Sequence, residues 1–212
     1  GDPAAPRLVV EKTSVDHTER MTAWAAVRLE QLAAENLCGF IFKSRSPSSG
    51  MERIKVYNGQ GVPSKTGVGI FAGLFMRRFP DLPVEDEGRL HDPLLRENFI
   101  ERIFVMRRWR DVLADGFSTG ALIEFHTRHK LLLMAHGVEG YRALGRLVAG
   151  AKDLPREQLL REYPALLMKS LRLIATTKKN VNVLHHLLGY FKKVLPPDEK
   201  HEVLELTDAY GR

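Results

Sequence analysis

The stretch Leu37-Cys38-Gly39-Phe40-Ile41-Phe42, followed by Lys43-Ser44-Arg45-Ser46-Pro47-Ser48-Ser49-Gly50, indicates the fold class of the first half of the chain. Its first six residues form a continuous apolar run after a helical pattern, and such a run is typical of a buried parallel strand. The next eight residues are small, polar and cationic, which predicts a loop. Because sites are often built at the carboxyl ends of parallel strands, residues 43–50 are a candidate site loop. A plain surface turn is the alternative.

Helix and strand patterns alternate on both sides of this strand. Asp16-His17-Thr18-Glu19 has the pattern of a capping box, and apolar residues at helical spacing follow it. Strands are predicted at residues 8–10, 54–57 and 82–84, a turn at 58–63, and helices at 68–78 and 93–112. This alternation predicts an α/β domain with a partial, Rossmann-like parallel sheet.

The second half has a different pattern. From Phe117 onward no stretch has a good strand signal. Helices are predicted at 119–136, 138–150, 156–175, 177–195 and 198–209, and Pro197 suits a first helical turn. The change near Asp115-Gly116 predicts an α/β domain at 1–115 and an all-α domain at 116–212.

The composition is that of a globular protein whose positive charge is concentrated in the second half. Of 212 residues, 44% are hydrophobic and 27% are charged; no apolar run is long enough to cross a membrane, and no secretory leader is visible. The single cysteine, Cys38, excludes a disulfide framework and predicts a cytoplasmic protein. Residues 125–195 hold 13 basic and 4 acidic side chains. Such a field suits nucleic acid, although a solvated basic surface is the alternative.

The segment Phe125–His136 is rich in histidine. On a helix, His129 and His136 share a face with apolar residues, while His126 and Lys130 lie on the neighbouring stripe. The spacing His126-x-x-His129 can bind a metal ion, but no acidic or cysteine partner lies nearby in sequence. Buried histidines with backbone partners account better for His129 and His136.

The segment Thr176–Lys193 divides into two stripes at helical spacing. Its apolar stripe, which predicts a buried face, holds Leu184, Leu187, Leu188, Phe191 and Val194. Its polar stripe and flanks hold Lys178, Lys179, Asn182, His185, His186, Gly189, Lys192 and Lys193. Lysines attract phosphates, whereas Asn, His and the nearby Tyr190 offer hydrogen bonds and stacking to exposed bases. A merely solvated face would include glutamate more often, so this pattern favours RNA binding.

Several motifs together resemble a known family. They are Glu11-Lys12-Thr13, Asp16-x-Thr18-Glu19-Arg20-Met21, Leu37-Cys38-Gly39-Phe40-Ile41, Lys43-Ser44-x-Ser46-Pro47-Ser48, Lys55-Val56-Tyr57, Leu82-Pro83-Val84-Glu85 and Glu87-Gly88-Arg89-Leu90. With them the first half resembles the thiouracil desulfidase (TudS-like) family. The second half, with Phe125-His126-x-Arg128-His129-Lys130 and Gly189-Tyr190-Phe191-Lys192-Lys193, resembles the YbgA-type helical domain. The fusion is similar to desulfidases that remove sulfur from 4-thiouridine in tRNA.

The resemblance implies a cofactor, a partner and site residues. In that family three cysteine thiolates hold a [4Fe–4S] cluster, whose open iron takes the sulfur of the thiolated base. By position, Lys43, Ser46 and Ser48 are the implied catalytic contacts, and Ser49 stands where the family has a cluster cysteine. The helical domain would hold tRNA. Its implied contacts are His126, Arg128, Lys130, Arg172, Lys178, Lys179, Asn182, His185, His186, Tyr190, Lys192 and Lys193.

The sequence departs from the family pattern at the cluster. Ser49 does not replace a thiolate, because a hydroxyl stays protonated near neutral pH. The other two cysteines would lie upstream of residue 1. We therefore expect no cluster in this chain, whether it is part of a cluster-ligand mutant or a natural, shortened relative that kept RNA binding. The alternatives to this inactive desulfidase-type protein are a cluster-free RNA-binding module without catalysis and a protein that acts in DNA repair or on another protein.

Overall fold

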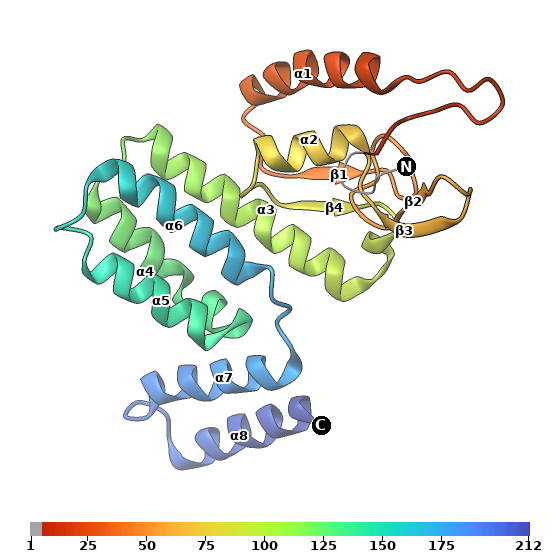
Figure 1. Cartoon of the computed structure of the whole chain (residues 1–212). Coiled ribbons are helices and arrows are strands. Elements are labelled where there is room, and N and C mark those ends of the chain that lie inside the picture. Colours follow the sequence, from red (N-terminus) through yellow and green to blue (C-terminus); the bar gives the residue numbers. More distant parts are fainter. Residues whose placement is uncertain (1–5) are drawn as a thin grey trace. The chain divides into compact units, whose positions relative to one another are not determined.

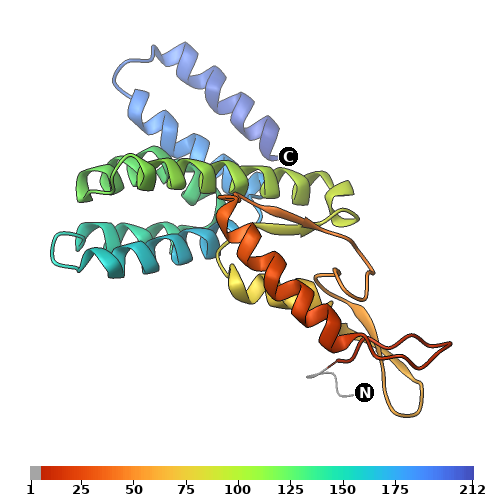
Figure 2. The same cartoon turned by 90° about the horizontal axis from the view of Figure 1, so that it is seen from above.

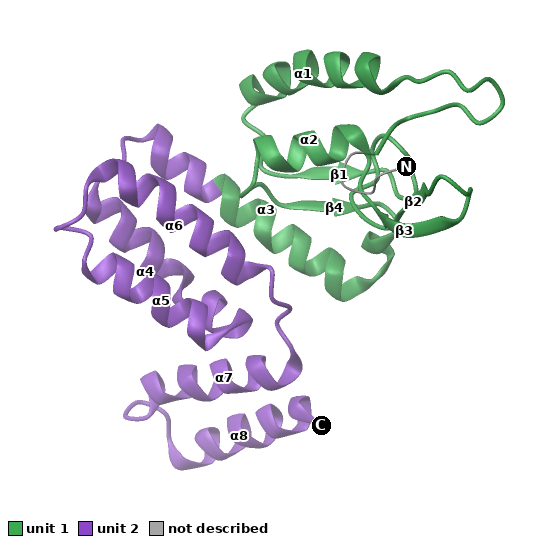
Figure 3. Cartoon of the chain, in the orientation of Figure 1, with its two compact units in different colours: residues 1–107 green, residues 108–212 purple. Residues whose placement is uncertain are grey.

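The computed structural model describes residues 6–212 (Figure 1). The chain forms two compact units, residues 1–107 and 108–212 (Figure 3). Unit 1 holds α1 (Thr18–Ala34), β1 (Phe40–Phe42), β2 (Ile54–Tyr57), β3 (Pro63–Gly67), α2 (Ile70–Arg78), β4 (Val84–Asp86), the 3-10 helix η1 (Arg89–His91) and most of α3 (Pro93–Ala114). Unit 2 holds the end of α3, α4 (Thr119–His136), α5 (Val138–Ala149), α6 (Arg156–Leu171), α7 (Thr177–Phe191) and α8 (Pro197–Gly211). A small α/β region is thus followed by a mostly helical one, as the sequence predicts.

The predicted buried strand is β1, and it pairs in parallel with β4. Phe40 and Phe42 pack against Phe75 of α2, with ring centroids 4.3 and 5.4 Å apart. On the other face lies α3, and a Cβ on Gly39 would come within 2.4 Å of Ile103 (Figure 1). Helices on both faces are what a parallel pair of strands requires, because each of its faces carries apolar side chains.

The strands β2 and β3 form an antiparallel hairpin that the sequence predicts only in part. The strand β2 and the following turn are predicted, whereas Pro63–Gly67 is not. The side chain of Asn58 accepts hydrogen bonds from the backbone N–H groups of Gln60 and Val62, at 3.0 and 2.9 Å. Such a turn returns the chain alongside β2. The residues of β3 are exposed apart from Gly67, so they carry no apolar alternation that would reveal a strand.

Two predictions near the N-terminus are wrong. Residues 8–10 form no strand, because only Val9 makes an isolated bridge, with Asp16. The capping box is also absent, since the residue that precedes α1 is His17 and its side chain forms no capping hydrogen bond. Asp16 lies one position too early: the helical N–H that donates to its carboxylate is that of the first residue, Thr18, at 2.9 Å, and Arg7 donates to the same carboxylate.

Unit 2 has the predicted helices, with changed ends. The helices α6 and α7 end at Leu171 and Phe191, each four residues before the predicted end. In the core of the unit, the ring of Trp109 lies 5.1 Å from that of Tyr163 and 5.4 Å from that of Phe125. The helices α7 and α8 lie side by side as a hairpin (Figure 1, Figure 2).

The division between the units falls inside α3, while the sequence places the boundary just after that helix. Among the described residues, no helix combines the length and apolar character of a membrane span.

Candidate functional sites

The loop of residues 43–50 is fastened to the start of α2. The carbonyl oxygen of Ser48 accepts hydrogen bonds from the N–H groups of Phe71 and Ala72, at 2.9 and 3.3 Å. The first N–H groups of a helix have no partner within it, so the loop supplies one. Ser46 Oγ accepts from the N–H of Ser49 at 3.1 Å and lies 3.3 Å from Ser48 Oγ. The structure thus brings Ser46, Ser48 and Ser49 together within one tight turn.

Lys43, the third predicted catalytic contact, is paired with a carboxylate. Its ammonium lies 2.7 Å from Glu87, which follows β4, and the backbone N–H of Ser44 donates to the same carboxylate at 2.5 Å. The hydrogen bond from Lys43, followed by that from Ser44, lowers the pKa of Glu87 to about 2. This pair joins the carboxyl ends of β1 and β4.

A cleft of about 870 Å³ opens beside this loop within unit 1. It is lined by Ser44, Arg45, Pro47, Glu52, Arg53, Ile54, Lys55, Tyr57, Lys65, Asp86, Gly88 and Arg89. The exposed face of β2 supplies Lys55 and Tyr57, because alternate side chains of a strand point to opposite faces and Ile54 is buried. The volume suits a ligand of nucleotide size. Lys43, Ser46, Ser48 and Ser49 do not line it.

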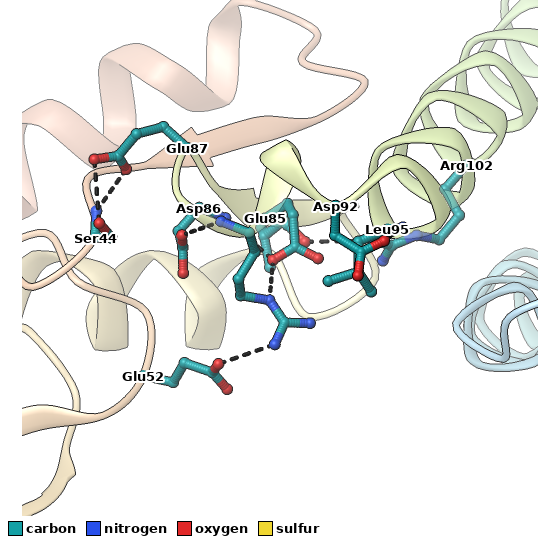
Figure 4. A network of polar contacts seen from close by, with 10 residues as sticks. Ser44, Glu52, Glu85, Asp86, Glu87, Asp92, Leu95 and Arg102 are labelled. Carbon is teal, nitrogen blue, oxygen red and sulfur yellow. Dashed lines mark hydrogen bonds and ion pairs between the residues drawn. The ribbon is translucent and has the colours of Figure 1, made fainter.

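Arg89 contacts three acidic residues beside the cleft, Glu52, Glu85 and Asp86, which are labelled in Figure 4. Its Nε donates to Glu85 at 2.6 Å, and its Nη1 donates to Glu52 at 3.1 Å. The hydrogen bond to Glu85 raises the pKa of Arg89, against the opposing effect of burial. Its backbone N–H donates to Asp86 Oδ1 at 2.8 Å. Glu85 and Asp86 are almost fully buried, at 4% and 6% exposure.

The sequence interpretation missed this second part of the site. Glu85 and Arg89 stand in the motifs quoted for the family resemblance, yet neither the sequence nor the resemblance assigned them a role. The available signal was a run of acidic residues at the end of a predicted strand, which is where parallel sheets build sites.

The residues of this chain do not fit an iron–sulfur cluster. Such a cluster takes cysteine thiolates, and the chain has one cysteine. Cys38 is half-buried before β1, with its sulfur 3.9 Å from the carbonyl oxygen of Asn36. Ser49, at the position of the family's cysteine, lies in the turn described above. Within residues 6–212 no group of three or more His, Cys, Asp or Glu side chains is arranged to hold a metal ion.

The histidines of α4 are core residues, as the spacing suggests for His129 and His136. His129 Nδ1 donates to the carbonyl oxygen of Phe125 at 2.7 Å, and His136 Nδ1 donates to that of Leu173. His126 is 4% exposed, and its Nδ1 lies 3.3 Å from the hydroxyl of Tyr163. His126 therefore lies inside unit 2, away from the surface where an RNA contact was predicted.

The polar stripe of α7 is on the surface. The exposed residues are Lys178, Asn182, His185, His186, Tyr190, Lys192 and Lys193. Tyr190 is 67% exposed, and its hydroxyl lies 3.2 Å from His186 Nε2. Neither α7 nor the two lysines after it include an acidic residue. We call this set the α7 face.

The other predicted contacts lie on other helices or have another partner. Arg128 is paired with Glu124 on α4, at 2.5 Å, and Lys130 is exposed on the same helix. Arg172 is exposed at the end of α6. Lys179 is half-buried, and its ammonium donates to two carbonyl oxygens.

The predicted apolar stripe of α7 is only partly buried. Leu188 is buried and Leu187 is partly buried, while Val183, which the stripe omits, is buried with them. Phe191 and Val194 are 51% and 77% exposed. The end of α7 thus presents both aromatic and cationic side chains.

Comparison with known families accounts for both parts of the chain. Residues 1–87 match the family of 2-thiouracil desulfurases, and residues 130–212 match a family described as a protein of unknown function, DUF1722. The chain joins a 2-thiouracil desulfurase domain to a DUF1722 domain. This confirms the resemblance seen in the motifs.

Among curated proteins, the chain is similar to the uncharacterized protein YbgA of Escherichia coli strain K12. It is 30% identical over 112 residues, which are 52% of this chain and 66% of the relative. The match therefore spans slightly less than two thirds of that protein. No solved structure matches the chain.

Proposed function

We propose that this chain binds RNA through the α7 face, and that tRNA carrying a thiolated uridine is its substrate class. The observation that carries the proposal is the α7 face itself, whose lysines, histidines and tyrosine are all exposed and stand without an acidic residue in α7. Lysines neutralise phosphates, and exposed aromatic rings stack on unpaired bases. Tyr190 and Phe191 beside Lys192 and Lys193 offer both contacts together.

The desulfurase domain supports a thiolated base as the chemical group that is recognised. Sulfur removal in such a protein uses a [4Fe–4S] cluster, which the donor set of this chain does not fit. We therefore assign to this chain the recognition of the substrate and not the removal of sulfur. We also propose that the protein acts in the cytoplasm, where tRNA is used.

A salt titration of tRNA binding tests this proposal. Each phosphate contact releases counterions, so each lost contact lowers the slope of log K against log salt by roughly 0.7 to 0.9. We expect the Lys192→Gln/Lys193→Gln double variant to bind tRNA more weakly and with a slope reduced by about 1.5. The matched control is Lys152→Gln/Lys169→Gln, which removes two exposed lysines of unit 2 outside α7. Equal losses in the two variants would show that the α7 face is not the binding surface.

A further inference from the structure

The cleft of unit 1 combines unpaired cations with one buried carboxylate. Arg45, Arg53, Lys55 and Lys65 line it, and none forms an ion pair with a carboxylate of the described residues. Arg89, the fifth cation of the lining, is already paired with Glu85 and Glu52. Four free cations in one concave site raise the local potential and suit an anionic ligand such as a phosphate.

Two of these arginines have an uncommon backbone conformation. The φ angles of Arg45 and Arg53 are 57° and 55°, in the left-handed region that residues other than glycine rarely occupy. Both side chains line the same cleft. Local strain of this kind is concentrated at ligand clamps, where the surrounding structure holds it in place. Its presence at two cationic residues of one cleft indicates a binding site rather than an incidental hollow.

Asp86 supplies an acceptor on the other side of the cleft. It is 6% exposed, its Oδ1 accepts from the N–H of Arg89 at 2.8 Å, and it lines the cleft. Its Oδ2 has no hydrogen-bond donor among the described residues and projects to the side where Glu52 lies (Figure 4). An acceptor oxygen that faces a cleft and receives no hydrogen bond from the protein can accept one from a ligand N–H.

Gly88 keeps this corner of the cleft open. A Cβ at this position would lie 3.1 Å from Asp86 Oδ1 and 3.2 Å from Ser44 Oγ. The planar edge of a base can therefore approach Asp86 beside Gly88, where a larger residue would crowd it.

We propose that this cleft binds a nucleotide whose base carries a ring N–H, as uracil and guanine do. Asp86 Oδ2 accepts the ring N–H, and Arg45, Arg53, Lys55 and Lys65 surround the phosphate. Tyr57, which is 54% exposed on the same wall, offers its ring for stacking. The nucleotide could belong to RNA or be free. The inference rests on the proposed function only where it takes RNA as the source.

The substitution Asp86→Asn tests the assignment with little change in shape. Asparagine keeps Oδ1 for the N–H of Arg89, and it replaces the accepting Oδ2 by a donating N–H₂ group. We expect the protein to bind UMP and GMP more tightly than CMP and AMP by about tenfold, the effect of one hydrogen bond to a charged group. In Asp86→Asn the order is expected to reverse, because the rings of cytosine and adenine present acceptors. Calorimetric titration of the four monophosphates measures both orders.

The cationic wall is tested separately. The Arg53→Ala/Lys55→Ala variant should bind all four monophosphates more weakly, by the same factor, and should keep the wild-type preference among the bases. The control variant Arg20→Ala/Arg28→Ala removes two exposed arginines of α1. It should change neither the affinity for the monophosphates nor the preference among the bases. The inference is overturned if Asp86→Asn keeps the wild-type order of bases while it unfolds at the wild-type urea concentration, or if the wild-type chain binds no monophosphate. Binding of UMP without binding of tRNA would retain the cleft, with free nucleotide as the source, and refute only the proposed function.

Discussion

The ammonium group of Lys179 donates a hydrogen bond to the carbonyl oxygen of His136 at 2.7 Å and to that of Ile174 at 2.9 Å. His136 is the last residue of α4, and the final carbonyls of a helix have no partner within it. Lys179 therefore joins the start of α7 to the end of α4. Lys178, the preceding residue, is exposed and makes no hydrogen bond or ion pair with any residue that the structure describes. Lys178 and Lys179 are both predicted to contact RNA, but Lys179 has a structural role and only Lys178 is available to a ligand.

We predict that Lys179→Met destabilises the protein and that Lys178→Met does not. Loss of hydrogen bonds from a charged donor to partly buried carbonyls should lower the free energy of unfolding by about 2 kcal/mol. A change at the exposed Lys178 should stay within about 0.5 kcal/mol. Urea denaturation followed by circular dichroism measures both. Lys178→Met should instead weaken tRNA binding. Identical unfolding curves for the two variants would mean that the ammonium of Lys179 contributes nothing to stability.

Gly69 permits the loop of residues 43–50 to sit on the start of α2. A Cβ there would lie 2.4 Å from the carbonyl oxygen of Ser48, which is backbone and cannot rotate away. Gly69→Ala should therefore destabilise the protein by about 1–3 kcal/mol, the usual cost of overpacking. The matched control is Gly59→Ala in the hairpin turn, where a Cβ would meet no atom within 4 Å. A loss of stability no larger than that of the control would contradict the role of Gly69.

Much of the fold can be predicted from local patterns. The apolar run that ends at Phe42 predicts β1, and helical periodicity predicts the starts of α4, α5, α6 and α7. The ends of α6 and α7 are harder to predict, because tertiary contacts fix them. The carbonyl oxygen of Ile174, for example, accepts a hydrogen bond from the ammonium of Lys179, and residue 174 is no longer part of α6. The strand β3 is also missed, since it is polar and exposed along nearly its whole length.

The candidate site is predicted only on its loop side. Residues 43–50 stand out by composition, but Lys43 and Ser44 meet Glu87, which is 43 residues from Ser44 in the chain. Local sequence patterns do not report such a contact. Asp86 is a charged residue, and charged residues are seldom buried unless they are paired. Its burial follows from its place at the end of β4 beside Arg89, which only the tertiary structure shows.

We predict that Lys43→Met raises the pKa of Glu87. The hydrogen bond from Lys43 is the main reason why the pKa of this carboxyl is about 2 instead of the usual 4.5. Without Lys43 the N–H of Ser44 remains as a donor, so the pKa should rise but stay below 4.5. Titration of the side-chain carboxyl carbon by NMR measures the shift, with Lys65→Met as the control. An unchanged pKa in Lys43→Met would show that the ion pair does not persist in solution.

The buried histidines of α4 make stability depend on pH. Burial lowers the pKa of His126 and of His129 below the usual 6.5. The charge of Lys130 lowers the first further, and those of Arg108 and Arg128 the second, while the hydrogen bond with the carbonyl of Phe125 acts in the opposite direction on His129. Below pH 6.5 the unfolded chain therefore binds more protons than the folded one. The resulting stability is fully present above about pH 6.5 and is lost as the pH falls through that value towards the folded pKa values.

Urea denaturation at pH 7.5 and at pH 5.5 measures this effect. We expect the wild-type protein to have a lower free energy of unfolding at pH 5.5, and His129→Gln to show a smaller difference between the two pH values, although it is less stable at both. His185→Asn, which changes an exposed histidine of α7, should keep the wild-type difference. If His129→Gln retains the full pH dependence, the folded protein does not lower the pKa of His129, and another group must cause the dependence.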